Sequence, residues 1–79
     1  MPRLHFHIRE NGRFIPDEEG QEFARSDDAR KEAVETGASI ARDVFIAGSA
    51  RRVMVEVSEE GTPFLTVSIT LDVKEPKAD

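Results

Sequence analysis

Two histidines near the start of the chain are the first candidates for chemistry. His5 and His7 lie two residues apart in a segment that alternates polar and apolar residues, so on a β-strand both imidazoles lie on the same side. Two imidazoles at this spacing can share a transition metal, but such a site needs a third ligand. Glu56 is the best candidate if its segment neighbours that of the histidines. We expect instead an exposed or interface surface, with no metal bound.

A group of carboxylates follows in residues 17–22, DEEGQE. Its spacing does not give the alternating acids and closing glutamate of an EF-hand loop, so it does not predict calcium binding. Carboxylates can also act in acid–base catalysis, but no nucleophile or oxyanion-stabilising group accompanies these. We therefore interpret the segment as a turn and expect a non-enzyme with no catalytic residues and no cofactor. The four acids of this group are Asp17, Glu18, Glu19 and Glu22.

Basic residues are concentrated only at Arg51 and Arg52, with Arg42 preceding them. Two or three arginines on an acidic domain are usually solvated. The net charge of −5 argues against a nucleic-acid-binding protein, since the affinity of such proteins rests on many Lys and Arg contacts to phosphate. Nucleic acid is therefore an unlikely partner, although a local basic patch is compatible with the average.

Short alternating segments predict four strands. Residues 3–9 form the first, and Asn11-Gly12 predicts a tight hairpin into residues 13–15, because both positions of a type I′ turn need positive φ. Pro16 should end the second strand. Residues 53–58 and 64–73 alternate again, as strands three and four, while residues 17–25 have no period and read as a loop anchored by Phe23.

One long helix is predicted between the two hairpins, from Ser26 to Gly48. Ser26 or Asp27 can serve as the N-cap, and a glycine after the last apolar residues is a typical helix end. Gly37 in the middle costs helix propensity, so we expect it to allow close approach to the sheet. The predicted buried face has the three-and-four spacing of a helix and consists of Ala29, Ala33, Gly37, Ile40, Ala41 and Val44.

The element order β-β-α-β-β predicts an α+β fold, a four-stranded, mainly antiparallel sheet with one long helix packed on one face. Strand order 2-1-3-4 makes every neighbouring pair antiparallel, which is the commoner arrangement. The order 2-1-4-3, with strands one and four parallel, is the alternative. We expect a single domain over residues 1–73 and a disordered, charged tail over residues 74–79.

Length and composition limit the possible classes of protein. A chain of 79 residues without cysteine has one small core and no disulfide framework. The sequence has no apolar run long enough to span a membrane, and His5, His7 and Arg9 interrupt the N-terminus where a signal peptide would need an apolar segment. A cytoplasmic location is the default expectation. Because a core of this size gives little net stability, a homodimer is possible.

The sequence resembles a family of short alphaproteobacterial proteins, frequent in rhizobia, that is catalogued only as a domain of unknown function. The likeness covers roughly residues 1–70 and lies in the start MPR with Phe6 and His7, the acidic turn DEEG at 17–20 and the helix start ARKEA at 29–33. His5 stands where members usually have an aromatic residue. The resemblance implies the fold and no known activity. A weaker likeness of pattern is to HicB-type antitoxin domains.

The sequence favours a protein-interaction module that binds a protein partner, or itself, through the uncovered face of its sheet, and the resemblance implies that it is bacterial. An antitoxin-like regulator that binds a toxin or nucleic acid is the alternative. Because histidine ordinarily gains its charge near pH 6.5, a homodimer through this face should weaken as pH falls from about 7 to about 5.5. An aromatic ring, a methionine and titratable groups suit a partner surface. The candidate partner surface consists of His5, His7, Arg9, Met54, Glu56, Phe64, Thr66 and Ser68.

Overall fold

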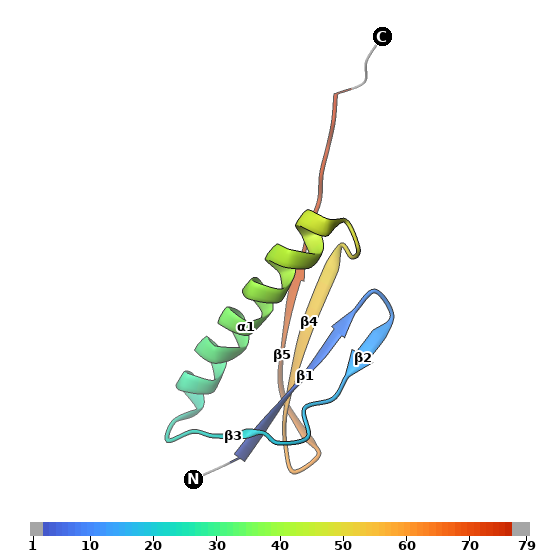
Figure 1. Ribbon diagram of the computed structural model, residues 1–79. Coiled ribbons are helices and arrows are strands. Elements are labelled where there is room, and N and C mark those ends of the chain that lie inside the picture. The colour runs from blue at the N-terminus through green and yellow to red at the C-terminus, as the bar shows by residue number, and fades with distance from the viewer. Residues whose placement is uncertain (1–2, 77–79) are drawn as a thin grey trace.

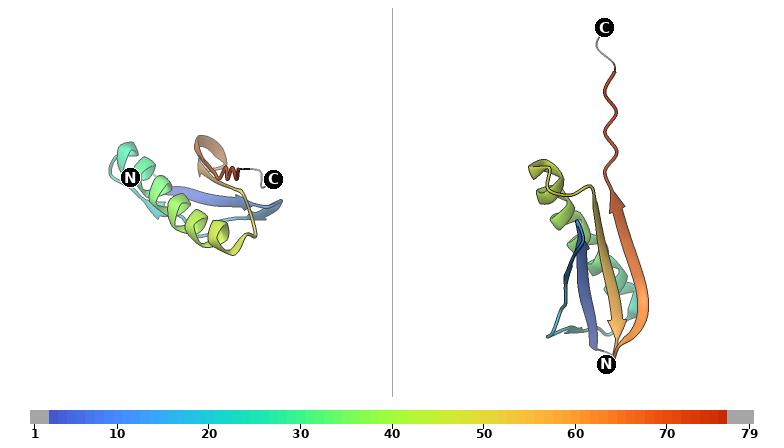
Figure 2. Two further views of the ribbon diagram at one scale, coloured as in Figure 1. Left: turned by 90° about the horizontal axis from the view of Figure 1, so that it is seen from above. Right: turned by 90° about the vertical axis from the view of Figure 1, so that its right-hand side faces the viewer.

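A computed structural model describes residues 3–76 and shows an open antiparallel sheet with one helix across one face (Figure 1). This confirms the predicted α+β class. Seen from above, the helix forms a layer of its own on one side of the sheet (Figure 2). The elements are β1 (Arg3–Glu10), β2 (Arg13–Ile15), β3 (Gln21–Glu22), α1 (Ser26–Ala47), β4 (Arg52–Glu59) and β5 (Thr62–Thr70).

The sheet has the order β2-β1-β4-β5, and every neighbouring pair is antiparallel. The prediction that placed the third predicted strand beside the first is thereby confirmed, and the alternative with a parallel pair is wrong. The short strand β3 pairs with Arg3 and Leu4 on the same edge of β1 that pairs with β2 further along. The missing period of residues 17–25 predicts a loop, so the sequence does not predict β3.

The core lies between α1 and the apolar face of the central strands. Leu4, Phe6 and Ile8 of β1 are buried, as are alternate valines of β4. This follows from the two-residue period of a strand, which sends every second side chain to the same face. The buried valines are Val53, Val55 and Val57.

The helix packs through very small side chains. Ala29, Ala33, Gly37 and Ala41 are buried, and the partly buried Ile40 packs against the core. A Cβ at Gly37 would lie 2.9 Å from Ile69 Cδ1 and 3.2 Å from Val55 Cγ2. The prediction that this glycine faces the sheet is confirmed, since the helix and the sheet approach so closely that even a Cβ would require the Ile69 side chain to shift.

The two ends of α1 differ in how well the sequence predicted them. The N-cap is Arg25, which is extended and makes no side-chain capping bond, while the Asp28 amide donates to the Arg25 carbonyl at 3.1 Å. The prediction that Ser26 or Asp27 caps the helix is therefore wrong. Gly48 ends the helix in the left-handed conformation with φ of 74°, as predicted.

The hairpin between β1 and β2 turns at Asn11 and Gly12, with φ of 46° and 78°. Positive φ at both positions is the requirement that Asn-Gly meets, so this hairpin is confirmed. After β5 the chain continues away from the sheet (Figure 2, right), and residues 71–76 have no regular secondary structure. The predicted disordered tail also includes residues 77–79, which lie outside the described residues. Within residues 3–76, no helix has the length and apolar character needed to cross a membrane.

Candidate interaction surface

The face of the sheet opposite α1 is here called the open face. His7 lies opposite Glu56 and Arg9 opposite Met54 in the β1–β4 pairing, so alternation places their side chains together on this face. All of the predicted surface residues except Phe64 lie on it. The open face consists of His5, His7, Arg9, Met54, Glu56, Ser58, Thr66 and Ser68, with Phe14 from β2.

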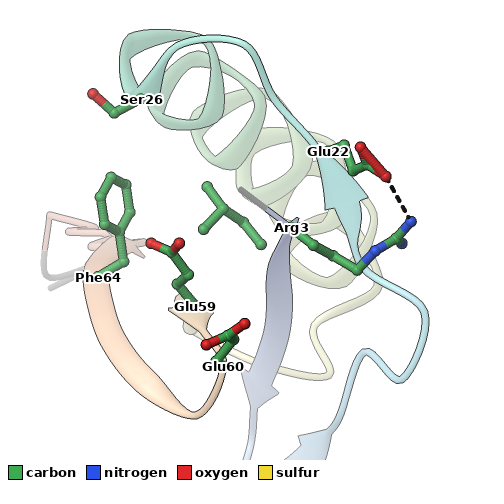
Figure 3. Close-up of a pocket in the computed structure, with 7 residues that line it drawn as sticks. Arg3, Glu22, Ser26, Glu59, Glu60 and Phe64 are labelled. Atoms are coloured by element: carbon green, nitrogen blue, oxygen red, sulfur yellow. Dashed lines mark hydrogen bonds and ion pairs between the residues drawn. The ribbon is translucent and has the colours of Figure 1, made fainter. Parts of the chain in front are cut away.

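Phe64 lies elsewhere because of a β-bulge. The β4–β5 register shifts between Val57 and Ser58, and an extra residue in a strand interrupts the alternation of faces. Phe64 instead lines a cavity of about 680 Å³ on the helix side, together with Leu4 and Ser26 (Figure 3). Its inclusion in the open face was wrong, since the sequence gives no sign of the bulge.

Phe14 belongs to the open face and was missed. It lies opposite Arg9 in the β1–β2 hairpin and is 45% exposed. The Arg9 guanidinium carbon lies 4.4 Å from the centroid of its ring, a cation–π contact, and the His7 ring centroid is 5.6 Å away. The register of a two-residue hairpin was the available signal, because it pairs Phe14 with Arg9 by counting alone.

An ion pair crosses the centre of the open face. Arg9 Nε donates to Glu56 Oε2 at 2.6 Å, so the carboxylate that we considered as a third metal ligand is directed to an arginine. The two histidine rings stack with centroids 6.2 Å apart. Within residues 3–76 there is no group of three His, Cys, Asp or Glu side chains that could hold a metal ion.

We therefore expect that the purified protein retains no stoichiometric zinc, because no suitable set of three ligands includes its two histidines in the described part of the chain. Elemental analysis after dialysis against zinc, with the His7→Ala variant as the matched control, measures this directly. A stoichiometric zinc content in the wild type that is lost in the variant would contradict the prediction.

His7 is held by hydrogen bonds on both sides of its ring. Its Nδ1 accepts from the Asp17 backbone amide at 3.0 Å, and its Nε2 lies 3.1 Å from Ser58 Oγ. Because Nδ1 accepts a backbone N–H, the arrangement requires the neutral tautomer with its proton on Nε2, which donates to the serine hydroxyl. His7 therefore connects the loop before β3 to the sheet.

Asp17 makes the second connection of that loop to β1. Its Oδ2 accepts from the Phe6 amide at 3.0 Å, at the point where the edge of β1 has neither β2 nor β3 beside it. Oδ1 accepts from the amides of Glu19 and Gly20 at 3.2 and 3.1 Å. Burial raises the pKa of Asp17, but these three amides and the nearby His5 together outweigh it and leave the pKa below its ordinary value.

Gly20 fits the same loop against β1. Its φ is 74°, and a Cβ would lie 3.0 Å from the Leu4 carbonyl oxygen and from His5 Nε2. Only glycine suits both the conformation and the space. Two members of the predicted acidic group therefore have different structural roles. Asp17 binds backbone amides, and Glu22 Oε2 forms an ion pair with the Arg3 guanidinium at 3.2 Å.

A basic corner lies at the hairpin end of the sheet, which Arg9 and Arg52 reach from the open face and Arg13, opposite Glu10, reaches from the other face. We use this name for Arg9, Arg13 and Arg52, which line a hollow of about 300 Å³ with Met54. Glu10 is an acidic residue that also lines it. Arg42, which stands near Arg52 in the sequence, lies on α1 and does not line this hollow. The corner therefore gathers three arginines beside the half-buried Met54, with Glu56 paired to Arg9 and Glu10 opposite Arg13.

The fold and the surface define a small α+β protein with one helix and an uncovered sheet face. Residues 3–70 match the model of a family described as a domain of unknown function (DUF6894). The chain belongs to this family, which confirms the resemblance to a family of unknown function. No match was found among proteins of curated function or among solved structures.

Proposed function

We propose that this protein is a non-catalytic interaction module whose open face binds an acidic segment of a partner protein, with Phe14 as the apolar anchor. The observation that supports this proposal most strongly is the exposed Phe14 ring, which packs against Arg9 and His7 beside the basic corner. Exposed aromatic rings and arginines are enriched where protein interfaces gain most of their affinity. The proposal keeps the cytoplasmic location expected from the sequence.

The charges support an acidic partner segment. Arg13 and Arg52 are exposed at the basic corner, while Glu56 on the open face is already paired with Arg9. Complementary charge raises the rate and the specificity of association more than it raises affinity. An acidic segment with one aromatic or aliphatic residue would match both the arginines and Phe14.

The pairing of the titratable groups supports a binding rather than a catalytic role. Glu56 is engaged by Arg9, and His7 is hydrogen-bonded through both ring nitrogens. Side chains that are hydrogen-bonded in this way keep the open face in one arrangement. The antitoxin-like alternative would use the same three arginines on nucleic acid, so the experiment below also separates these two classes of partner.

Peptides selected by display on the immobilised protein test the proposal. We expect acidic peptides with an aromatic or aliphatic residue, and NMR shift changes at Phe14, Met54 and Arg52 when such a peptide is titrated into labelled protein. Phe14→Ala should weaken binding by about ten-fold or more, as expected for a side chain that contributes over 1.4 kcal/mol.

Ile15→Ala is the matched control. Ile15 is the next residue of the same strand, with a similar exposure of 41%, but it pairs with Ile8 on the other face of the sheet. Equal binding by the two variants would contradict the proposal. Micromolar binding to random duplex DNA at physiological salt, abolished by Arg52→Ala, would favour the antitoxin-like regulator instead.

A further inference from the structure

We infer that the free edge of β5 pairs antiparallel with β5 of a second copy and joins the two sheets into one. β5 is nine residues long and ends the strand order on one side, with β4 as its neighbour. Its sequence, TPFLTVSIT, contains no charged residue. Edge strands that stay unpaired are usually short, charged or covered, and β5 lacks these protections over most of its length.

The opposite edge of the sheet shows the contrast. There β2 is three residues long and β3 two, and the Asp17 carboxylate binds the Phe6 amide between them. Within residues 3–76, the chain thus covers one edge with short strands and a side chain and leaves the other open. On β5, Pro63 and the bulge affect only the first residues.

The hydrogen-bonding groups of β5 point outward at regular intervals. The Leu71 amide donates to the Arg51 carbonyl across the β4–β5 pair at 2.9 Å. Because the direction alternates along a strand, the N–H and C=O groups of Thr66, Ser68 and Thr70 point away from β4. Their small side chains are exposed and leave room for another strand.

A second copy of the chain fits this edge because β5 is complementary to itself. An antiparallel pair on a two-fold axis at Ser68 places Thr66 opposite Thr70 of the other copy, and Val67 opposite Ile69. Hydroxyl side chains then meet on the open face, and half-buried apolar ones meet on the helix face. A slip by one residue would mix the two faces.

The chain that follows β5 favours the same partner. Residues 71–76 continue in line with the strand, past the sheet (Figures 1 and 2), and Val73 is 56% exposed. In the paired arrangement this segment runs beside the β4–β5 turn of the other copy. Lys74 would approach Glu59 and Glu60 there, which adds opposite charges at both ends of the pair.

The substitution Ser68→Lys tests the inference, since residue 68 lies on the proposed two-fold axis and the two new lysines would meet there. We expect the wild type to dimerise in sedimentation experiments over about 10 µM to 1 mM, and Ser68→Lys to weaken the dimer by about five-fold or more. Ser39→Lys, the same change on the exposed side of α1, should dimerise like the wild type. Mixing Ser68→Lys with Ser68→Glu should restore association, because opposite charges then meet on the axis.

Amide exchange in the wild type gives a measurement that needs no variant. Exchange at Thr66, Ser68 and Thr70 should slow as the protein concentration rises. A monomer throughout the concentration range, equal weakening by Ser39→Lys, or no gain on mixing would each overturn the inference. Phe14 lies on β2 at the opposite edge of the sheet, so failure of the dimer leaves the peptide experiment unaffected.

Discussion

Replacement of Gly37 by leucine is expected to destabilise the protein by about 2 kcal/mol, within the usual cost of overpacking a core even after the gain in helix propensity. A Cβ at this position already lies 2.9 Å from Ile69 Cδ1. The three further carbons of leucine would enter the same contact and push α1 away from β4 and β5. Urea denaturation at neutral pH measures the change.

Two control variants make this prediction specific. Glu35→Leu adds leucine to the exposed side of the same helix and should change stability little. Gly37→Ala should also stay within about 1 kcal/mol of the wild type, because its gain in helix propensity offsets a small displacement of the flexible Ile69 side chain. Equal denaturation midpoints for Gly37→Leu and Glu35→Leu would contradict the packing of α1 against the sheet.

The features predicted correctly from the sequence are those that a short pattern determines. Strict alternation over residues 3–9 and 53–58 identifies two strands and their buried faces, because one face must lie against the core. Asn11-Gly12 determines a hairpin through its backbone conformation. The small residues on one side of α1 predicted its contact with the sheet. The general preference for antiparallel neighbours then predicted the correct strand order, β2-β1-β4-β5.

The features that the sequence did not predict depend on contacts between distant segments. The bulge beside Val57 arises from the match between β4 and β5, and it moved Phe64 to the helix side. Arg25 became the N-cap because the chain arrives extended from β3, with φ of −138°. The partner of the Asp17 carboxylate, the Phe6 amide, is exposed by a gap between β2 and β3 that no local pattern reveals.

The candidate surface was predicted in composition but not in arrangement. Alternation correctly placed His5, His7 and Arg9 on one face with Met54 and Glu56. The sequence could not show that Glu56 pairs with Arg9, because that depends on the register between β1 and β4. It also could not show that His7 binds the loop at Asp17, since a hydrogen bond to a backbone amide does not depend on the type or spacing of side chains in the sequence.

Replacement of Asp17 by alanine should cost about 1–2 kcal/mol at neutral pH, the lower part of the usual penalty for leaving a buried donor without its partner, because this bond is part-buried. The Phe6 amide loses its acceptor within the core strand β1, whereas the exposed Glu19 amide can turn to water. Asp17→Asn keeps one oxygen and should lie between alanine and the wild type. Glu18→Ala, the exposed neighbour, is the control and should have little effect in the same urea titrations.

The pH dependence of stability should identify the carboxylate as the cause. The pKa of Asp17 in the folded protein is below its ordinary value, so the unfolded chain takes up this proton first as pH falls. The contribution of Asp17 is therefore complete above the unfolded pKa of about 3.9 and is lost as pH falls through the lower, folded pKa. Asp17→Ala should lose less stability than the wild type between pH 5 and pH 2. An equal loss in both proteins would show that the carboxylate does not hold the loop to β1 in its charged form.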